Sequence, residues 1–219
     1  MKQYQRIKNK YKECILMFRI GDFYEMFYDD AKTASKVLDI TLTSKNVRDI
    51  DIPLAGVPYH SVDPYIAELV SSGFKVAVCD QVEDPDKAKG LVKRDVVRVV
   101  TPGTVMENQA LKAQSNNYTM SIYCHEEFGI AVCDLSTGEF FTTDAKDLEE
   151  LKNQIAIFDP KEFVVPDSLL VNRELKGFFE ENGFLESYYD ESFSYNNAEK
   201  TLLEHFGVNS DTTLSWNDE

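Results

Sequence analysis

The sequence predicts an α/β fold arranged as two successive domains. Strand-like runs of β-branched and aromatic residues alternate with segments of helical spacing, which is typical of mixed α/β layers. The chain has 219 residues, enough for two domains that each bury a core. Charge also divides the chain, because residues 1–115 hold 17 Lys and Arg against 16 Asp and Glu, whereas residues 116–219 hold 6 against 22. The net charge of −15 therefore comes from the second half.

The first half opens with a short helix predicted at 4–12, a buried strand at 14–20 and a turn at Gly21-Asp22. A helix is predicted to follow over 23–38. Asp22 is a good N-cap for this helix, and Glu25 stands three residues later, as in a capping box. Helical spacing of core-type residues supports the same helix: Tyr24, Phe27, Tyr28, Ala31 and Leu38.

Beyond this helix, the first half is predicted to alternate between loops, a helix and strands. The segment PLAGVPYH is expected to be irregular after a polar loop, because it holds two prolines and a glycine. The elements predicted next are a helix at 62–72, a strand at 74–82, a charged loop at 83–93 and a β-rich run at 96–101. The polar segment 109–120 follows the turn signal TPGT, so we predict one domain over 1–115 and another over 116–219.

The second half has a different order of elements. Three successive strand candidates, YTMSIYC, FGIAVCDLS and GEFFTTD, are joined by short turns at HEE and STG. A helix, the strand EFVVP, a helix, the strand FLESYY and a final helix at 196–207 are predicted after them. Three antiparallel strands followed by alternating helices and strands is the order of RNase H-like folds. We expect this domain to be incomplete at its C-terminal end, because the sequence stops soon after the last helix.

The cysteines and the hydrophobic pattern indicate where the protein works. Cys14, Cys79, Cys124 and Cys133 show no C-x-x-C spacing, and all but Cys124 lie within apolar runs. We expect small buried residues in a reducing compartment rather than disulfides or zinc ligands. No apolar run reaches the roughly 18 residues of a membrane span, and the N-terminus lacks the apolar region of a signal peptide. The expected location is cytoplasmic, associated with the nucleoid.

Sequence motifs of catalysis are missing. There is no phosphate-binding G-x-x-x-x-G-K-[ST], no G-x-S-x-G and no H-E-x-x-H, and the three histidines have no ligand spacing. We therefore expect no catalytic residue, no metal ligand and no enzymatic activity in this chain. The best alternative is a metal-dependent nuclease, since Asp134 ends a strand of the RNase H-like half. We favour a turn-forming role for Asp134, because no second and third carboxylate match it.

Phe23 is the residue that the helix prediction leaves unexplained. At a first helical position beside a glycine, its ring would project outward, with the Glu25 carboxylate two residues later. Such an aromatic suits a wedge that enters the DNA minor groove and stacks on a base. Unstacking a base step costs roughly a few kcal/mol, and stacking on an aromatic returns roughly 1–3 kcal/mol per base. The balance favours defective pairing, so a wedge reads deformability rather than base sequence.

Glu25 sharpens this hypothesis. A carboxylate close to phosphates is unfavourable unless it shares a hydrogen bond with a base, so it penalises perfect duplex and tolerates a displaced base. The overall charge argues against DNA, because DNA affinity depends on Lys and Arg that neutralise phosphates. The first half, with a net charge of +1, remains compatible with DNA, whereas the second half, at −16, is better suited to contacts with protein.

Five sequence blocks resemble the mismatch-recognition domain of MutS proteins, in the family's order and over most of residues 1–105. The blocks are GDFYEMFYDDA, LDITLT, PLAGVPYHSVDPYIAELV, VAVCDQVEDP and VVRVVTPGT. The second half resembles, more weakly, the family's connector domain. The resemblance places the family's Phe-x-Glu motif on Phe23-Tyr24-Glu25. It implies that Phe23 wedges into the minor groove and stacks on a mispaired or unpaired base, while Glu25 hydrogen-bonds that base.

Four further residues match positions that lie near the DNA in family members: Ile20, Lys45, Leu54 and Arg94. Many relatives have methionine at Ile20, which keeps the apolar character, and Lys-Arg at Lys45-Asn46, a change that weakens a phosphate contact. Arg94 would lie beside the DNA backbone. If the family resemblance is set aside, the sequence favours a solvated charge in a loop over a DNA contact for Arg94.

The resemblance also implies partners. The connector would relay to lever and ATPase domains absent from this sequence and would offer a surface to MutL. ATP and magnesium would belong to the absent ATPase domain, the full-length protein would be a homodimer, and this fragment would be monomeric, with no membrane partner. Another alternative is a relative that keeps the scaffold without mismatch recognition. The presence of both Phe23 and Glu25 counts against it.

Overall fold

The computed structural model describes residues 1–47, 49–83, 90, 92–105 and 116–208. The chain divides into two compact units, Met1–Asn117 and Tyr118–Glu219. Much of the charged loop predicted at 83–93, and of the polar boundary segment 109–120, lies outside the described residues. Each unit contains a sheet and a hydrophobic core of its own, as the predicted α/β fold class requires.

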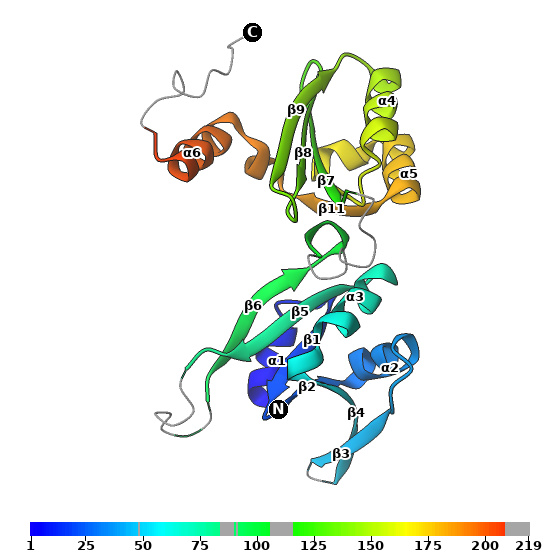
Figure 1. The fold of residues 1–219 in the computed structure, drawn as a ribbon, viewed down its shortest axis with the longest axis vertical. Helices are drawn as coiled ribbons and strands as arrows, with labels where there is room; N and C mark the ends of the chain where they lie inside the picture. The colour runs from blue at the N-terminus through cyan, green and yellow to red at the C-terminus, as the bar shows by residue number, and fades with distance from the viewer. Residues whose placement is uncertain (48, 84–89, 91, 106–115, 209–219) are drawn as a thin grey trace. The chain divides into compact units, whose positions relative to one another are not determined.

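The first unit is built on a six-stranded mixed sheet in the order β3-β4-β2-β1-β5-β6 (Figure 1). Its strands are β1 (Cys14–Ile20), β2 (Phe23–Phe27), β3 (Thr43–Val47), β4 (Ile50–Pro58), β5 (Lys75–Gln81) and β6 (Arg94–Val100). Its helices are α1 (Lys2–Lys8), α2 (Tyr28–Val37) and α3 (Asp63–Ser71), with 3-10 turns η1 (Tyr59–Ser61) and η2 (Pro102–Thr104). β1 and β5 are parallel, and the other neighbours are antiparallel.

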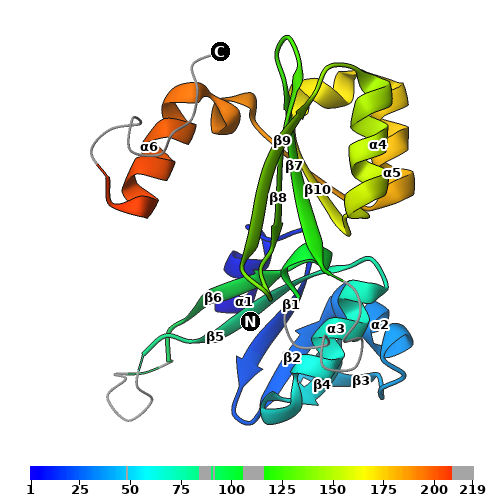
Figure 2. The same cartoon turned by 45° about the horizontal axis from the view of Figure 1, so that its top comes forward.

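Both faces of the first sheet are covered, by different helices. α2 and α3 pack on one face, where Tyr24 and Met26 of β2 join a large apolar cluster. α1 packs on the other face, where Tyr4 and Ile7 meet Phe27 and the buried residues of β1 and β5. Figure 2 shows α2 and α3 together on one side of the sheet and α1 on the other. β1 is therefore buried on both faces, as its continuous apolar sequence predicts.

The helix predicted over 23–38 is wrong in its first turn. Residues Phe23–Phe27 form β2, and the helix begins only at Tyr28. Gly21 takes a φ of 57° at the first position of a two-residue turn, where a type II′ hairpin favours glycine, and Ile20 pairs directly with Phe23. Pairing with β1 and β4 on its two sides outweighs the helical spacing. Asp22 consequently caps no helix, and its carbonyl oxygen accepts a hydrogen bond from the amide of Tyr59.

The predictions of a polar loop and of an irregular PLAGVPYH segment were also wrong. β3 and β4 form an antiparallel hairpin, and β4 runs through both Pro53 and Pro58. A proline removes only one donor from a ladder, and β4 has pairing partners on both sides. The alternation of buried Ala55 and Val57 with the outward Gly56 is that of a strand.

The second unit follows the predicted order of elements. Its sheet, ordered β11-β10-β7-β8-β9, consists of β7 (Tyr118–Cys124), β8 (Phe128–Asp134), β9 (Glu139–Ala145), β10 (Glu162–Pro166) and β11 (Phe184–Tyr188). The first three strands form an antiparallel meander, and β10 and β11 continue the sheet in parallel with β7. The helices are α4 (Leu148–Phe158), α5 (Arg173–Asn182) and α6 (Tyr195–Phe206), with 3-10 turns η4 (Asp167–Val171) and η5 (Asp190–Phe193).

The two faces of the second sheet differ in how they are covered. α4 and α5 lie side by side on one face and bury Leu151, Ile155, Leu175 and Phe179 against it (Figures 1 and 2). α6 stands on the other side of the sheet, and none of its residues, all of which are described, is buried. Among the described residues of this unit, the apolar core therefore lies on one face of the sheet.

The cysteines are free thiols in the structure. Cys14 and Cys79 are buried, as predicted, whereas Cys124 and Cys133 are partly exposed. Cys133 was expected to be buried, but in β8 it alternates with Ile130 and Val132, which pack in the core under α4 and α5, so it points to the other face of the sheet. Among the described helices, none is long and apolar enough to cross a membrane.

Candidate functional site

The centre of the candidate site is β2, whose side chains alternate between the two faces of the sheet. Tyr24 is buried, with 5% of its surface exposed, and Met26 is buried beside it. Phe23 and Glu25 point to the opposite face, and the exposed fraction of Phe23 is 46%. The prediction that Phe23 projects outward is confirmed, although it projects from the start of a strand and not of a helix.

The backbone of Phe23 is held on both sides while its ring is left open. Its Cα pairs with Ile20 across the tight turn and with Pro58 of β4. The ring therefore stands on a three-stranded support next to a two-residue hairpin. A side chain mounted in this way can be pressed against another molecule with little loss of backbone entropy.

Glu25 lies two residues further along the same face. It pairs with Phe18 of β1 and Gly56 of β4, and 19% of its side chain is exposed. Oε2 of Glu25 is 3.5 Å from Nζ of Lys45 on β3, and this Nζ lies 5.8 Å from the ring centroid of Phe27. The structure thus joins two sequence-predicted residues, Glu25 and Lys45, in a partly exposed ion pair. Such pairs contribute only about 0–1 kcal/mol, so this one is easily exchanged.

Ile20 and Leu54 flank these residues on the same face. Ile20 pairs with Phe23, and Leu54 pairs with Phe27. Both are partly buried against the cluster that α1 covers, which leaves part of each side chain accessible. They supply an apolar border to the exposed ring of Phe23 and the carboxylate of Glu25.

Arg94 is placed differently from what the sequence suggested. It opens β6 instead of lying in a loop, and only 7% of its surface is exposed. Its Nε donates to the carbonyl oxygen of Arg19 at 2.5 Å, its Nη1 donates to the carbonyl oxygen of Val92 at 2.8 Å, and its guanidinium lies over the ring of Phe18. Arg94 therefore secures the end of β1 just before the hairpin turn. A contact between Arg94 and a DNA backbone stays a prediction.

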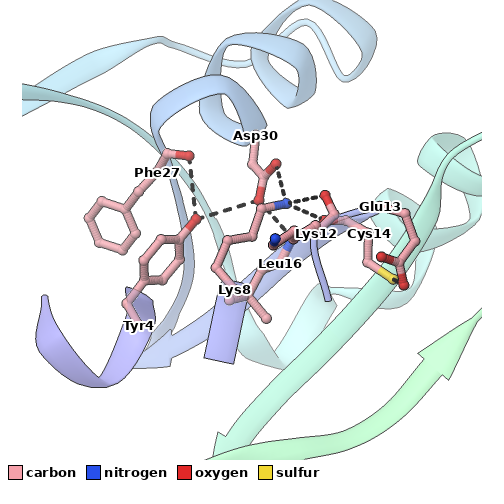
Figure 3. A network of polar contacts seen from close by, with 8 residues as sticks. All are labelled: Tyr4, Lys8, Lys12, Glu13, Cys14, Leu16, Phe27 and Asp30. Atoms are coloured by element: carbon pink, nitrogen blue, oxygen red, sulfur yellow. Dashed lines mark hydrogen bonds and ion pairs between the residues drawn. The ribbon is translucent and has the colours of Figure 1, made fainter. Parts of the chain in front are cut away.

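Sequence reasoning missed a polar network that anchors the far end of β2 (Figure 3). Oδ2 of Asp30 accepts from the Leu16 amide of β1 at 3.1 Å, and Oδ1 accepts from Nζ of Lys8 at 2.9 Å. The hydroxyl of Tyr4 donates to the carbonyl oxygen of Phe27 and reaches Oδ2 of Asp30, each at 3.4 Å. These contacts tie α1, β1 and the junction of β2 with α2 together. The sequence YDD at 28–30 reads as an ordinary acidic first turn and does not reveal them.

A second anchor lies on the opposite face of β2. The hydroxyl of Tyr24 donates to Oδ2 of Asp80 at 2.8 Å, and burial together with this carboxylate raises the pKa of Tyr24 to about 12. The guanidinium of Arg19 stacks 3.4 Å from the ring centroid of Tyr59 and lies near the same carboxylate. β2 is therefore held from both faces as well as from both edges.

The alternative centred on Asp134 gains no support from the geometry. Asp134 is 1% exposed, and its Oδ1 accepts from the amide of Ser136 at 2.8 Å and from the hydroxyl of Ser136 at 2.6 Å. These are the bonds of a turn-forming aspartate. Within the described part of the chain, no group of three or more His, Cys, Asp or Glu side chains is arranged to hold a metal ion.

Comparison with known proteins matches each of the two units to a protein family. Residues 1–109 match the family MutS domain I, and residues 117–218 match the family MutS domain II. The DNA mismatch repair protein MutS of Staphylococcus epidermidis (strain ATCC 12228 / FDA PCI 1200) is 46% identical over 206 residues, which cover 93% of this chain and 24% of that protein. MutS proteins of Staphylococcus aureus strains JH9 and Newman are 46% identical over 207 residues, with the same coverage. The chain thus spans about a quarter of the length of these curated relatives. It belongs to the MutS family and corresponds to the family's first two domains.

Proposed function

We propose that this chain reads DNA for mispaired or unpaired bases, with Phe23 as the wedge that enters the minor groove and stacks on the defective base. The observation that carries the proposal is an exposed aromatic side chain on a strand that is anchored from both edges and both faces. The relatives of this chain are named as DNA mismatch repair proteins, which supports a role in the same process.

Rigid mounting is what turns an exposed ring into a sensor. A ring on a flexible loop would retreat when a sound base stack resists it, whereas Phe23 stays where β1 and β4 hold it. The cost of opening the stack then falls on the DNA. This cost is roughly a few kcal/mol per step for paired DNA, and it is lowest where pairing is already lost.

Glu25 and Lys45 complete the discrimination. In the free protein the carboxylate of Glu25 has Lys45 as its counter-ion. When a displaced base presents a hydrogen-bond donor, Glu25 accepts from that base, and Lys45 turns to a phosphate. Perfect duplex offers no such partner, so the carboxylate then faces the phosphates at a cost. Ile20 and Leu54 give the wedge apolar neighbours, and Arg94 acts by holding the end of β1.

The second unit serves, in this proposal, as a connector to the rest of a longer protein. Its net charge of −16 makes it unsuited to DNA and suited to protein contacts, including MutL and lever and ATPase domains beyond this sequence. Hydrolysis of ATP with magnesium, and assembly into a homodimer, would belong to those domains. This chain would act as a cytoplasmic DNA-binding module without catalytic activity of its own.

Fluorescence anisotropy at low salt tests the wedge. The wild-type chain, Phe23→Ala and Phe140→Ala are each titrated into a labelled duplex with one G·T pair and into its fully paired counterpart. Phe140 provides the matched control, because it is also an exposed strand phenylalanine, with 62% of its surface accessible, but it lies on β9 of the second unit.

The expected result is a preference for the G·T duplex that Phe23→Ala loses and Phe140→Ala keeps, with equal melting temperatures for all three proteins. A Phe23→Ala protein that still prefers the mismatch would overturn the wedge. A wild-type chain without preference would show that this chain does not discriminate by itself.

A further inference from the structure

Gly56 occupies an unusual place in the candidate site. It lies inside β4, directly opposite Glu25 in the β2–β4 ladder, and it is exposed on the face that carries Phe23. Leu54 and Pro58 are its neighbours on that face, because side chains of a strand alternate. β4 therefore presents a notch between two larger apolar side chains.

The fold itself gives no reason for a glycine at this position. The described glycines with a positive φ are Gly21, Gly73, Gly90, Gly138 and Gly207, so Gly56 has a backbone that other residues also adopt. Pairing between β2 and β4 runs without a register shift from Phe23↔Pro58 to Phe27↔Leu54, so the glycine does not serve a bulge.

Space is also available for a larger residue. A Cβ at Gly56 would lie 3.4 Å from the carbonyl oxygen of Tyr24, 3.7 Å from Cγ of Glu25 and 3.9 Å from Cδ1 of Phe23, which are ordinary contact distances. Glycine in a strand interior is less stable than alanine because it loses more backbone entropy on folding. What remains is the use of a strand glycine where another molecule approaches the backbone closely.

The position of the missing Cβ identifies the approaching group. It would lie 3.9 Å from Cδ1 of Phe23 and 3.7 Å from Cγ of Glu25, so whatever fills the notch touches both side chains. We infer that Gly56 is the floor of the DNA-reading site, where the minor-groove edge of the base beside the wedge comes down onto the backbone of β4. This inference rests on the proposed function and adds a residue that determines specificity.

The notch lets the base edge approach the backbone of β4 more closely than a side chain would allow. With only a hydrogen on Cα, the base edge can sink far enough for the Glu25 carboxylate to meet it from the side while Phe23 stacks above. A methyl group would lift the base away from Glu25. Because hydrogen bonds weaken steeply with misaligned geometry, recognition of the displaced base suffers first.

Two substitutions and one matched control test the inference. Gly56→Ala adds one methyl group to the notch, and Gly56→Val fills it with a residue that suits a strand. Gly129→Ala is the control, because Gly129 is also exposed inside a strand, its φ is not positive, and a Cβ there would lie 3.9 Å from the nearest atom, the carbonyl oxygen of Tyr123. Each variant of the full chain is titrated with the G·T duplex and its paired counterpart, beside Phe23→Ala, and its melting temperature is recorded.

We expect Gly56→Ala to melt at or above the temperature of the wild type, because alanine restricts the unfolded chain. Its affinity for the G·T duplex should fall by about tenfold, the usual order for an extra methylene forced into a packed contact, and that of Gly56→Val should fall further. Gly129→Ala should likewise melt at or above the temperature of the wild type, for the same reason, and should leave the affinity unchanged.

Gly56→Ala that binds the G·T duplex like the wild type would overturn the inference, and so would a melting temperature several degrees lower, which would make the glycine a requirement of the fold. Phe23→Ala distinguishes a failure of the Gly56 notch from a failure of the proposed function. If Phe23→Ala abolishes mismatch preference while Gly56→Ala does not, the notch alone is refuted. If Phe23→Ala retains the preference, or the wild type has none, the proposed function fails and the notch fails with it.

Discussion

At the residue scale, the candidate site follows from alternation along one strand. Phe23 and Glu25 share a face because they are two residues apart in β2, and Tyr24 between them is buried on the other face. Lys45 and Gly56 join them from β3 and β4. The chemistry of the site is therefore decided by few side chains, and each can be changed without disturbing the core.

Glu25→Ala is expected to reduce the ratio of G·T to fully paired affinity by about tenfold. A hydrogen bond to a charged group contributes about 1.5–3 kcal/mol, and the displaced base would lose it. Paired duplex should bind slightly better, because the carboxylate no longer faces the phosphates. Competition titration at low salt measures both affinities, with the exposed Asp29→Ala as control. An unchanged ratio for Glu25→Ala would contradict its role in discrimination.

Buried thiols predict a loss of stability in alkaline solution. Burial raises the pKa of Cys14 to about 11 and that of Cys79 to about 12, from an ordinary value of 9.0. A raised pKa means that the folded state keeps its protons while the unfolded state releases them above pH 9. The contribution to stability is thus complete below pH 9 and is lost as the pH rises toward 11 and 12.

Urea unfolding at increasing pH measures this loss, and thiol-reagent kinetics provide an independent check. In the native state Cys14 and Cys79 should react slowly, since the thiolate is the reactive species, and urea should expose them. Rapid native-state modification of either residue would contradict its burial.

At the element scale, the short α1 helix matters more than its length suggests. Tyr4 and Lys8 of α1 meet Asp30 at the start of α2, and Asp30 also holds the amide of Leu16 in β1 (Figure 3). Tyr28, at the junction of β2 and α2, has a φ of 56°, which is costly for a residue with a side chain. The network supplies the contacts that keep this junction in place.

Asp30→Ala is expected to lower the free energy of unfolding by about 2–3 kcal/mol, because it leaves the partly buried Leu16 amide without its side-chain acceptor and the Lys8 ammonium without its carboxylate partner. Asp29→Ala is the matched control, since Asp29 is its neighbour and forms an exposed pair with Lys32. That variant should change the free energy by no more than about 0.5 kcal/mol. Equal effects in urea unfolding would show that the network does not hold the junction.

Prediction of the elements succeeded where the pattern is local. The strands and helices of the second half appear in the predicted order, as do β1, α3 and β5 of the first half. The helix over 23–38 failed at residues 23–27, because helical spacing and the capping-box pattern are read within one segment, whereas β2 exists through its pairing with β1 and β4. β4 was missed for the same reason.

On the scale of the whole molecule, charge separates the two units. The first unit carries a net charge of +1 and the second −16, and each has its own core. The acidic surface of the second unit repels DNA at distances up to the Debye length. This length is about 8 Å at physiological salt and longer at low salt. The DNA affinity of the full chain is therefore expected to depend strongly on the ionic strength.

Residues 1–117 alone are expected to bind duplex DNA more tightly than the full chain at low salt, by about threefold to tenfold, because the acidic unit is removed. The difference should shrink as salt is raised. Anisotropy titrations of the two proteins across a salt series measure it, and circular dichroism checks that the shorter chain is folded. Equal affinities at low salt would contradict the expectation.

The sequence by itself determined the α/β class, the division of charge, the family resemblance and the exposed Phe23 with Glu25 two residues later. Each of these depends on residue identities or on patterns within a few positions. Tertiary structure decided that Phe23 stands on a strand, that Lys45 meets Glu25, that Gly56 lies beside both Phe23 and Glu25, and that Arg94 is bound to Arg19, 75 positions away. Such contacts arise when the sheet brings distant segments together, and no local pattern encodes them because each partner's environment is created only by the fold.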